Sequence, residues 1–125
     1  MDNNLRELSN QLLAMPKQMA DTQLIILEKS QEAQKIENEI SEIETKLKMS
    51  IANKLDESGK KVYSNADARE AAFVEACTGE FDLIELKSKL AAIQNQIQLS
   101  KIAYERVGNE QKNLRIVLQL FSEAE

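Results

Sequence analysis

The sequence contains no histidine and no tryptophan, and its 125 residues include only one proline, one cysteine and three glycines. Histidine is the side chain that most often acts as a general base and as a metal ligand. Its absence removes most hydrolase mechanisms, so we expect no catalytic residue, no bound metal and no cofactor. The single cysteine, Cys77, has no partner for an intrachain disulfide, which is typical of a reducing compartment.

The chain also lacks a net positive charge and long apolar runs. Sixteen Lys and Arg face 21 Asp and Glu, which gives a net charge of -5 and a pI near 4.9. An acidic chain repels phosphate backbones and anionic lipid, so direct nucleic-acid binding is disfavoured. No apolar run reaches the roughly 18 residues that cross a bilayer, and residues 1–4 lack a signal-peptide pattern. We therefore expect a soluble cytoplasmic protein with no membrane contact.

What the chain has in abundance is Leu, Ile, Ala, Glu, Lys and Gln, which lose little rotamer freedom in a helix. The pattern predicts an all-α fold in one domain, residues 1–125. A short helix is expected over residues 3–14, ending near Pro16. A long helix is expected over residues 17–55, because Ile26, Ala33, Ile40 and Leu47 recur every seven residues.

The middle of the chain predicts a reversal. Residues 56–65 are polar and contain Gly59, which favours a turn. A short helix is expected over residues 66–77, capped either by Ser64 with Asp67 or by the competing Asn65. Thr78 and Gly79 are expected to end it.

The last segment, residues 80–122, has the clearest helical pattern in the chain. Twelve positions alternate steps of three and four, and ten of them are apolar. They are Leu83, Leu86, Leu90, Ile93, Ile97, Ser100, Tyr104, Val107, Gln111, Leu114, Leu118 and Phe121. Two long helices of similar length joined by a compact tip predict an antiparallel coiled-coil hairpin.

Charges beside the two apolar stripes are complementary, but they leave the register of the hairpin open. If Leu47 lies near Leu83, then Glu44 comes opposite Lys87. The same register brings Lys46 opposite Lys89, and a shift of one heptad is the alternative.

A two-helix hairpin buries too little apolar surface to be stable on its own. We expect the N-terminal helix and a second copy of the chain to cover the rest, which makes the protein a homo-oligomer. The expected oligomer surface consists of Leu24, Ile25, Leu27, Leu99, Ile102, Ile116, Val117 and Leu120.

The segment from Gly59 to Phe81 resembles small coiled-coil proteins encoded by tailed phages and prophages. In those proteins a tip of the form Gly-Lys-x-x-Tyr-Ser/Thr-Asn-x-x-x-Arg precedes a short helix and a long heptad helix, and the similarity spans residues 40–121. Gly79 departs from the turn residue that the pattern usually carries. The resemblance implies a bacterial host cell and an accessory role in phage DNA metabolism, with Tyr63, Asn65 and Arg69 at a partner-binding tip.

The expected function is therefore that of a non-enzymatic helical interaction or scaffold protein with a protein partner at the tip. The residues of the expected contact are Lys60, Lys61, Tyr63, Asn65 and Arg69. One alternative is local, with Asn65 capping the short helix and Arg69 pairing nearby. Two other functions stay open: a prefoldin-like coiled-coil chaperone, and a weak single-strand nucleic-acid binder through the tip.

Overall fold

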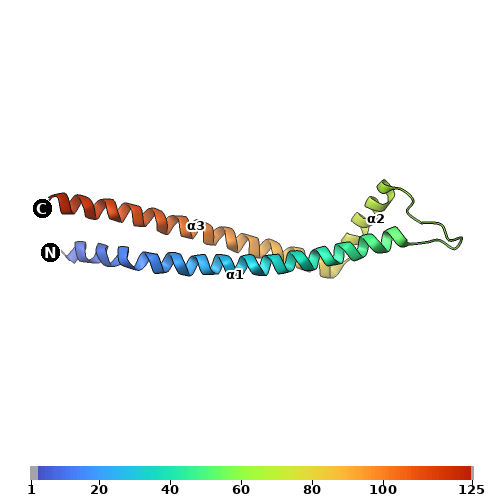
Figure 1. Ribbon diagram of the computed structural model, residues 1–125, viewed down its shortest axis with the longest axis horizontal. Helices are drawn as coiled ribbons and strands as arrows, with labels where there is room; N and C mark the ends of the chain where they lie inside the picture. Colours follow the sequence, from blue (N-terminus) through green and yellow to red (C-terminus); the bar gives the residue numbers. More distant parts are fainter. Residues whose placement is uncertain (1–2, 125) are drawn as a thin grey trace. The chain divides into compact units, whose positions relative to one another are not determined.

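The computed structural model describes residues 3–124 and is helical apart from the tip, residues 54–65, and a two-residue break at Gly79 and Glu80 (Figure 1). Helix α1 spans Asn3–Asn53, α2 spans Ala66–Thr78 and α3 spans Phe81–Ala124. Among residues 3–124 there is no β-strand, only an isolated antiparallel bridge between Leu55 and Lys61. The predicted all-α class is confirmed, with two long helices and a short one between them.

Helix α1 continues through Pro16, so the expected break between a helix over 3–14 and a second over 17–55 is wrong. A proline inside a helix removes one hydrogen bond and costs about 3 kcal/mol. Here the cost is offset because the apolar spacing crosses Pro16 without interruption: Leu12, Met15 and Met19 are all buried or half-buried, and Met15 is only 5% exposed. There is consequently no separate N-terminal helix.

The short helix α2 begins directly after its capping residue, Asn65. The side chain of Asn65 accepts a hydrogen bond from the amide of Ala68 at 2.8 Å, which satisfies one of the four free amides of the first turn. The competing Ser64 cap is not used. At the other end Gly79 follows α2, and its amide donates to the carbonyls of Ala76 and Cys77.

The tip between α1 and α2 is a tight turn built around Asp56. The amide of Asp56 donates to the carbonyl of Lys60 at 2.7 Å, and the amide of Val62 donates to the carbonyl of Lys54 at 3.0 Å. Gly59 has φ of +81°, a backbone conformation in which only glycine is unstrained. The polar stretch that predicted a reversal therefore forms a short ribbon closed by the single Leu55–Lys61 bridge, and α1 ends at Asn53, two residues before the predicted end.

The chain folds into two compact units, and the first combines the beginning of α1 with the end of α3. This unit 1 contains residues 3–31 and 94–124 of the described chain. The Gln23 amide donates to the Tyr104 hydroxyl at 3.0 Å, and a Cβ placed on Gly108 would lie 3.7 Å from the Met19 methyl. As numbering rises along α1 it falls along α3, so the two helices are antiparallel within unit 1.

The second unit, residues 32–93, holds most of the buried apolar side chains. Its core residues are Ala33, Ile36, Ile40, Leu83 and Ile93. Glu44 on α1 and Lys87 on α3 form an ion pair at 3.8 Å. Of the two registers that the sequence left open, this unit has the one in which Glu44 lies opposite Lys87.

Candidate functional site

Unit 1 exposes apolar side chains that a stable helical pair normally buries. Met15 is its only buried large apolar residue among those described, whereas unit 2 has five buried apolar residues. All eight residues of the expected oligomer surface are exposed, from Val117 at 36% to Leu120 at 60%. A half-exposed Leu or Ile leaves on the order of 1 kcal/mol of burial free energy unrealised, so the eight together represent a substantial driving force for association.

The N-terminal residues do not cover this surface, contrary to expectation. Because residues 3–14 belong to α1, Leu5, Leu8 and Leu12 lie on the half-buried side of that helix. Leu13 is 77% exposed and enlarges the apolar surface. The sequence suggested that the N-terminal helix and a second copy of the chain cover this surface. Only the second copy remains, as a proposal.

Most exposed apolar residues of unit 1 fall into two stripes, one on each helix, and Ile25 and Phe121 lie outside both. The α1 stripe consists of Leu13, Ala20, Leu24 and Leu27, which are spaced seven, four and three residues apart. The α3 stripe consists of Leu99, Ile102, Ile116, Val117 and Leu120. Steps of three, four and seven keep the α1 residues on one side of that helix. The α3 residues form two groups, Leu99 with Ile102 and Ile116 with Val117 and Leu120, which are separated by a polar stretch.

The five tip residues divide into two kinds. Asn65 caps α2, and the Arg69 guanidinium donates to the Tyr63 carbonyl at 3.4 Å, so these residues take part in local structure. Lys60 and Lys61 have exposed side chains on the ribbon that precedes α2. The structure brings all five residues into one segment and leaves the two lysines accessible to a partner.

The tip carries a positive charge although the chain is acidic. Residues 54–65, between α1 and α2, contain three Lys and two Asp or Glu, a net charge of +1, whereas the whole chain has a net charge of -5. The side chain of Lys48 lies 4.8 Å from the centroid of the Phe73 ring and helps to hold α2 against α1. The local charge favours an acidic partner at the tip.

Asp56 stabilises the turn that presents Lys60 and Lys61. One of its carboxylate oxygens accepts hydrogen bonds from the Ser58 hydroxyl at 2.7 Å and from the amides of Ser58 and Lys60, each at 2.9 Å. These bonds, with that from the Ser58 hydroxyl foremost, lower the pKa of Asp56 below its ordinary value of 3.8. The hydrogen bonds of the turn thus favour the ionised form of this carboxylate.

A groove that sequence reasoning missed lies between α2 and the first turns of α3. It has a volume of about 540 Å³ and is lined by Glu44, Phe73, Val74, Cys77, Thr78, Leu83, Ile84 and Lys87. Phe81, the first residue of α3, is 85% exposed. The signal in the sequence was the pair Phe81 and Ile84, which fall outside the regular spacing of α3.

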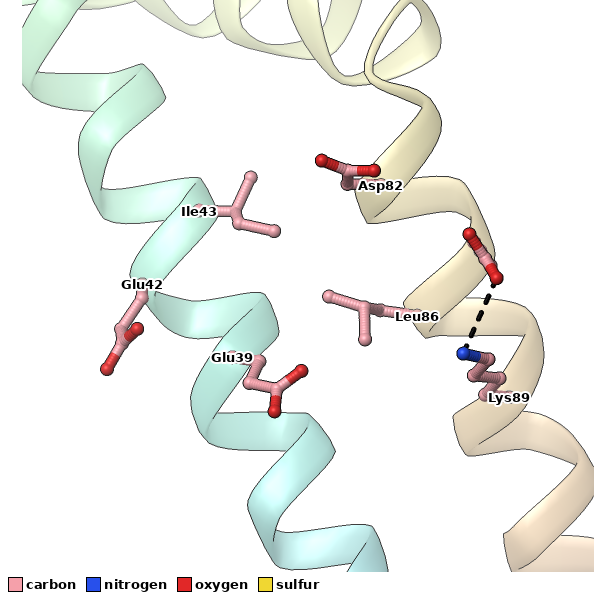
Figure 2. A pocket seen from close by; sticks show the side chains of 7 residues that line it. Glu39, Glu42, Ile43, Asp82, Leu86 and Lys89 are labelled. Atoms are coloured by element: carbon pink, nitrogen blue, oxygen red, sulfur yellow. Dashed lines mark ion pairs between the residues drawn. The ribbon is translucent and has the colours of Figure 1, made fainter.

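A smaller cleft of about 340 Å³ lies between α1 and α3 within unit 2 (Figure 2). Ile43 and Leu86 point toward one another from the two helices, and Glu42 points away from α3. Lys89 pairs with Glu85 at 3.4 Å. The carboxylates of this cleft do not form a metal-binding group. Among residues 3–124 there is no group of three or more His, Cys, Asp or Glu side chains that could hold a metal ion.

Within residues 3–124, none of the helices combines the length and the apolar content of a bilayer-spanning segment. No protein-family model matches the chain, and no curated protein or solved structure matches it either.

Proposed function

We propose that this protein is a non-enzymatic helical scaffold that self-associates through unit 1 and presents the tip of unit 2 to a protein partner. The observation that carries the proposal is the exposure of the α1 and α3 stripes. Large contiguous apolar surfaces on a soluble helical protein are typical of protein–protein contacts. A second copy of the chain is present wherever the first one is, and at the same concentration as the first, so we take it as the partner that covers the stripes.

The proposed scaffold is an antiparallel coiled-coil hairpin in which α1 and α3 pair along their length. Its support is the spacing of buried and half-buried positions. On α3 they run in steps of three and four from Leu83 to Leu118, and on α1 from Leu5 to Leu47. Such regular spacing keeps one side of each helix facing the other.

The proposed setting is a bacterial host cell, as an accessory factor in phage or prophage DNA metabolism. The support for this part is the resemblance of residues 59–81 to small phage coiled-coil proteins, together with the two accessible lysines at the tip. In this role the tip binds a protein of that machinery, and the oligomer holds several tips together.

A second candidate function is single-strand nucleic-acid binding through the tip, favoured by its local net charge of +1 and the exposed Lys60 and Lys61. It predicts binding that weakens steeply as salt rises and that is lost when Lys60 and Lys61 are replaced by Glu. The chaperone alternative has less support, because the tip in the described chain carries one isolated bridge in place of the strand hairpins of prefoldin subunits.

Self-association is tested with two variants that each add one negative charge to an exposed position of unit 1. Leu24→Glu places the charge in the α1 stripe, and Gln94→Glu places it away from both stripes. Light scattering at tens of micromolar is expected to give a multiple of 14.1 kDa for the wild type and Gln94→Glu. Leu24→Glu is expected to give a smaller mass. Equal masses for the two variants would contradict the assignment of the stripe.

The tip contact is tested by affinity capture from phage-infected extract. The wild type is compared with Lys60→Glu/Lys61→Glu, which changes exposed side chains and leaves the Asn65 cap in place. A DNA-metabolism protein that is retained by the wild type and lost with the variant supports the adaptor role. Identical sets of captured proteins would refute a contact through these lysines.

A further inference from the structure

The last turns of α1 and the first turns of α2 enclose a cleft of about 330 Å³ next to the tip, the α1–α2 cleft. Its lining belongs entirely to unit 2, so one compact part of the fold forms the whole cleft. The lining combines an apolar part with charged side chains. The apolar part consists of Ile51, Ala52 and Phe73, and the charged side chains are Lys48, Arg69 and Glu70.

The ammonium group of Lys48 lies at the wall of this cleft without a carboxylate partner. Its Nζ is 4.8 Å from the centroid of the Phe73 ring, and cation–π attraction holds it there. Within residues 3–124, Lys48 forms no ion pair. Because an aromatic ring carries no net charge, the positive charge of Lys48 stays available to an anionic ligand.

Arg69 brings a second cation to the same cleft. Its Nη1 donates to the carbonyl oxygen of Tyr63 at 3.4 Å, and this bond fixes the half-buried side chain against the start of α2. A guanidinium has five N–H donors, so most of them remain for a ligand. In the part of the chain that the structure describes, Arg69 has no carboxylate partner either. A carboxylate is the group that a guanidinium binds with the best geometry.

The carboxylate that belongs to the cleft does not neutralise these two cations. Glu70 lines the cleft but is exposed to solvent, and it pairs with neither Lys48 nor Arg69. Two cations and one carboxylate give the lining a net charge of +1 on a chain whose net charge is -5. The cleft is therefore complementary in charge to an acidic ligand.

We propose that the α1–α2 cleft binds a short acidic segment of the protein partner. One apolar side chain of the segment packs on Ile51 and Phe73, and a neighbouring carboxylate binds between Lys48 and Arg69. The volume lies at the lower end of the range for pockets that enclose a small molecule, which suits a few side chains of an extended segment. The inference rests on the tip contact proposed above and names the chemistry of its partner.

Single-stranded nucleic acid fits the same cleft less well. Its general binders stack bases on open aromatic faces along a basic groove. Here the ammonium of Lys48 lies over the Phe73 ring, and the carboxylate of Glu70 repels phosphate. The apolar lining and the two cations therefore favour a peptide with both an apolar and an acidic side chain.

The experiment first selects short random peptides from a display library on the immobilised full-length chain. The expected result is an enrichment of peptides that combine Asp or Glu with a large apolar residue. One enriched peptide then carries a fluorescent label, and its affinity for the wild type and for variants is measured by anisotropy.

The variants separate the cleft from the general charge of the chain. Lys48→Gln and Arg69→Gln are each expected to weaken binding about tenfold, because each removes a charge-assisted contact. Ala52→Leu is expected to weaken it by filling the cleft at unchanged charge. The matched control is Lys46→Gln, which removes the same charge from an exposed position of α1 outside the cleft and is expected to change the affinity little. Far-ultraviolet circular dichroism checks that each variant is folded.

Three results would overturn the assignment of the cleft: no enrichment of acidic peptides, equal weakening by Lys46→Gln and Lys48→Gln, or tighter binding of oligothymidylate than of the selected peptide. The proposed tip contact would still stand in these cases if a captured protein is lost with Lys60→Glu/Lys61→Glu. Captured proteins that do not change with that variant would refute the tip contact itself.

Discussion

Replacing Leu83 by Ala is expected to be the most destabilising large-to-small change in unit 2. Leu83 is 1% exposed and lines the meeting point of all three helices with Phe73 and Cys77. Removing a fully buried leucine costs the lost transfer free energy plus that of the cavity, about 3 kcal/mol. For a chain of this size, that corresponds to a fall in melting temperature of roughly 12 °C.

The neighbouring residue supplies the matched control. Ile84 is 49% exposed on the same turn of α3, so Ile84→Ala is expected to cost about 1 kcal/mol or less. Alanine has the highest helix propensity, so neither variant weakens α3 intrinsically. Thermal unfolding is followed by far-ultraviolet circular dichroism at one protein concentration, because self-association makes stability depend on concentration. Equal shifts for the two variants would refute the burial of Leu83 in a three-helix junction.

Three further predictions concern local features. Pro16→Ala is expected to stabilise the chain by up to about 3 kcal/mol in denaturant unfolding, because it restores a helical hydrogen bond; unchanged stability would place a helix break at this position after all. Asn65→Ala is expected to cost about 1 kcal/mol and to speed amide exchange in the first turn of α2, whereas Asn65→Asp keeps the acceptor and the protection. The pKa of Asp56 is lowered in the folded chain, so its stabilisation of the turn is complete above the unfolded value of 3.8 and is lost as the pH falls through the lower folded pKa. The protection of the Ser58 and Lys60 amides, measured by nuclear magnetic resonance as exchange relative to an unstructured peptide at the same pH, is expected to fall over that range; constant protection would contradict the hydrogen bonds to the carboxylate.

The regular parts of this fold are predictable from its sequence, because helix periodicity is a repeated signal. On α3, every position of the predicted series from Leu83 to Leu118 is buried or half-buried, and the structure ends the series only at the exposed Phe121. The ends of α2 and α3 lie within two residues of their predicted positions, since Asn65 and Gly79 signal them locally.

Single-residue rules failed where packing along the helix outweighs them. The rule that proline ends a helix predicted a break at Pro16, yet the three-and-four spacing already ran through Met15 and Met19. The choice between Ser64 and Asn65 as the cap could not be made, because both side chains offer an acceptor at the same helix start. It depends on backbone angles that the tip ribbon imposes.

The candidate surfaces were predictable to different degrees. The exposure of apolar residues outside the regular spacing, such as Leu24 and Leu120, was predictable because a single helix pair has no second apolar side to bury; that they form an oligomer surface stays a prediction. The groove beside Val74 and Phe81 was not predicted, because its shape depends on the angle between α2 and α3, which no sequence period encodes. The roles of Tyr63 and Arg69 depend on one hydrogen bond of the folded tip.

The most direct test of the account is the mass of the wild-type protein over a dilution series, measured by sedimentation equilibrium from tens of micromolar downward. The account predicts a multiple of 14.1 kDa at the highest concentration, falling toward 14.1 kDa on dilution. A mass of 14.1 kDa throughout the series would contradict self-association through the exposed stripes of unit 1.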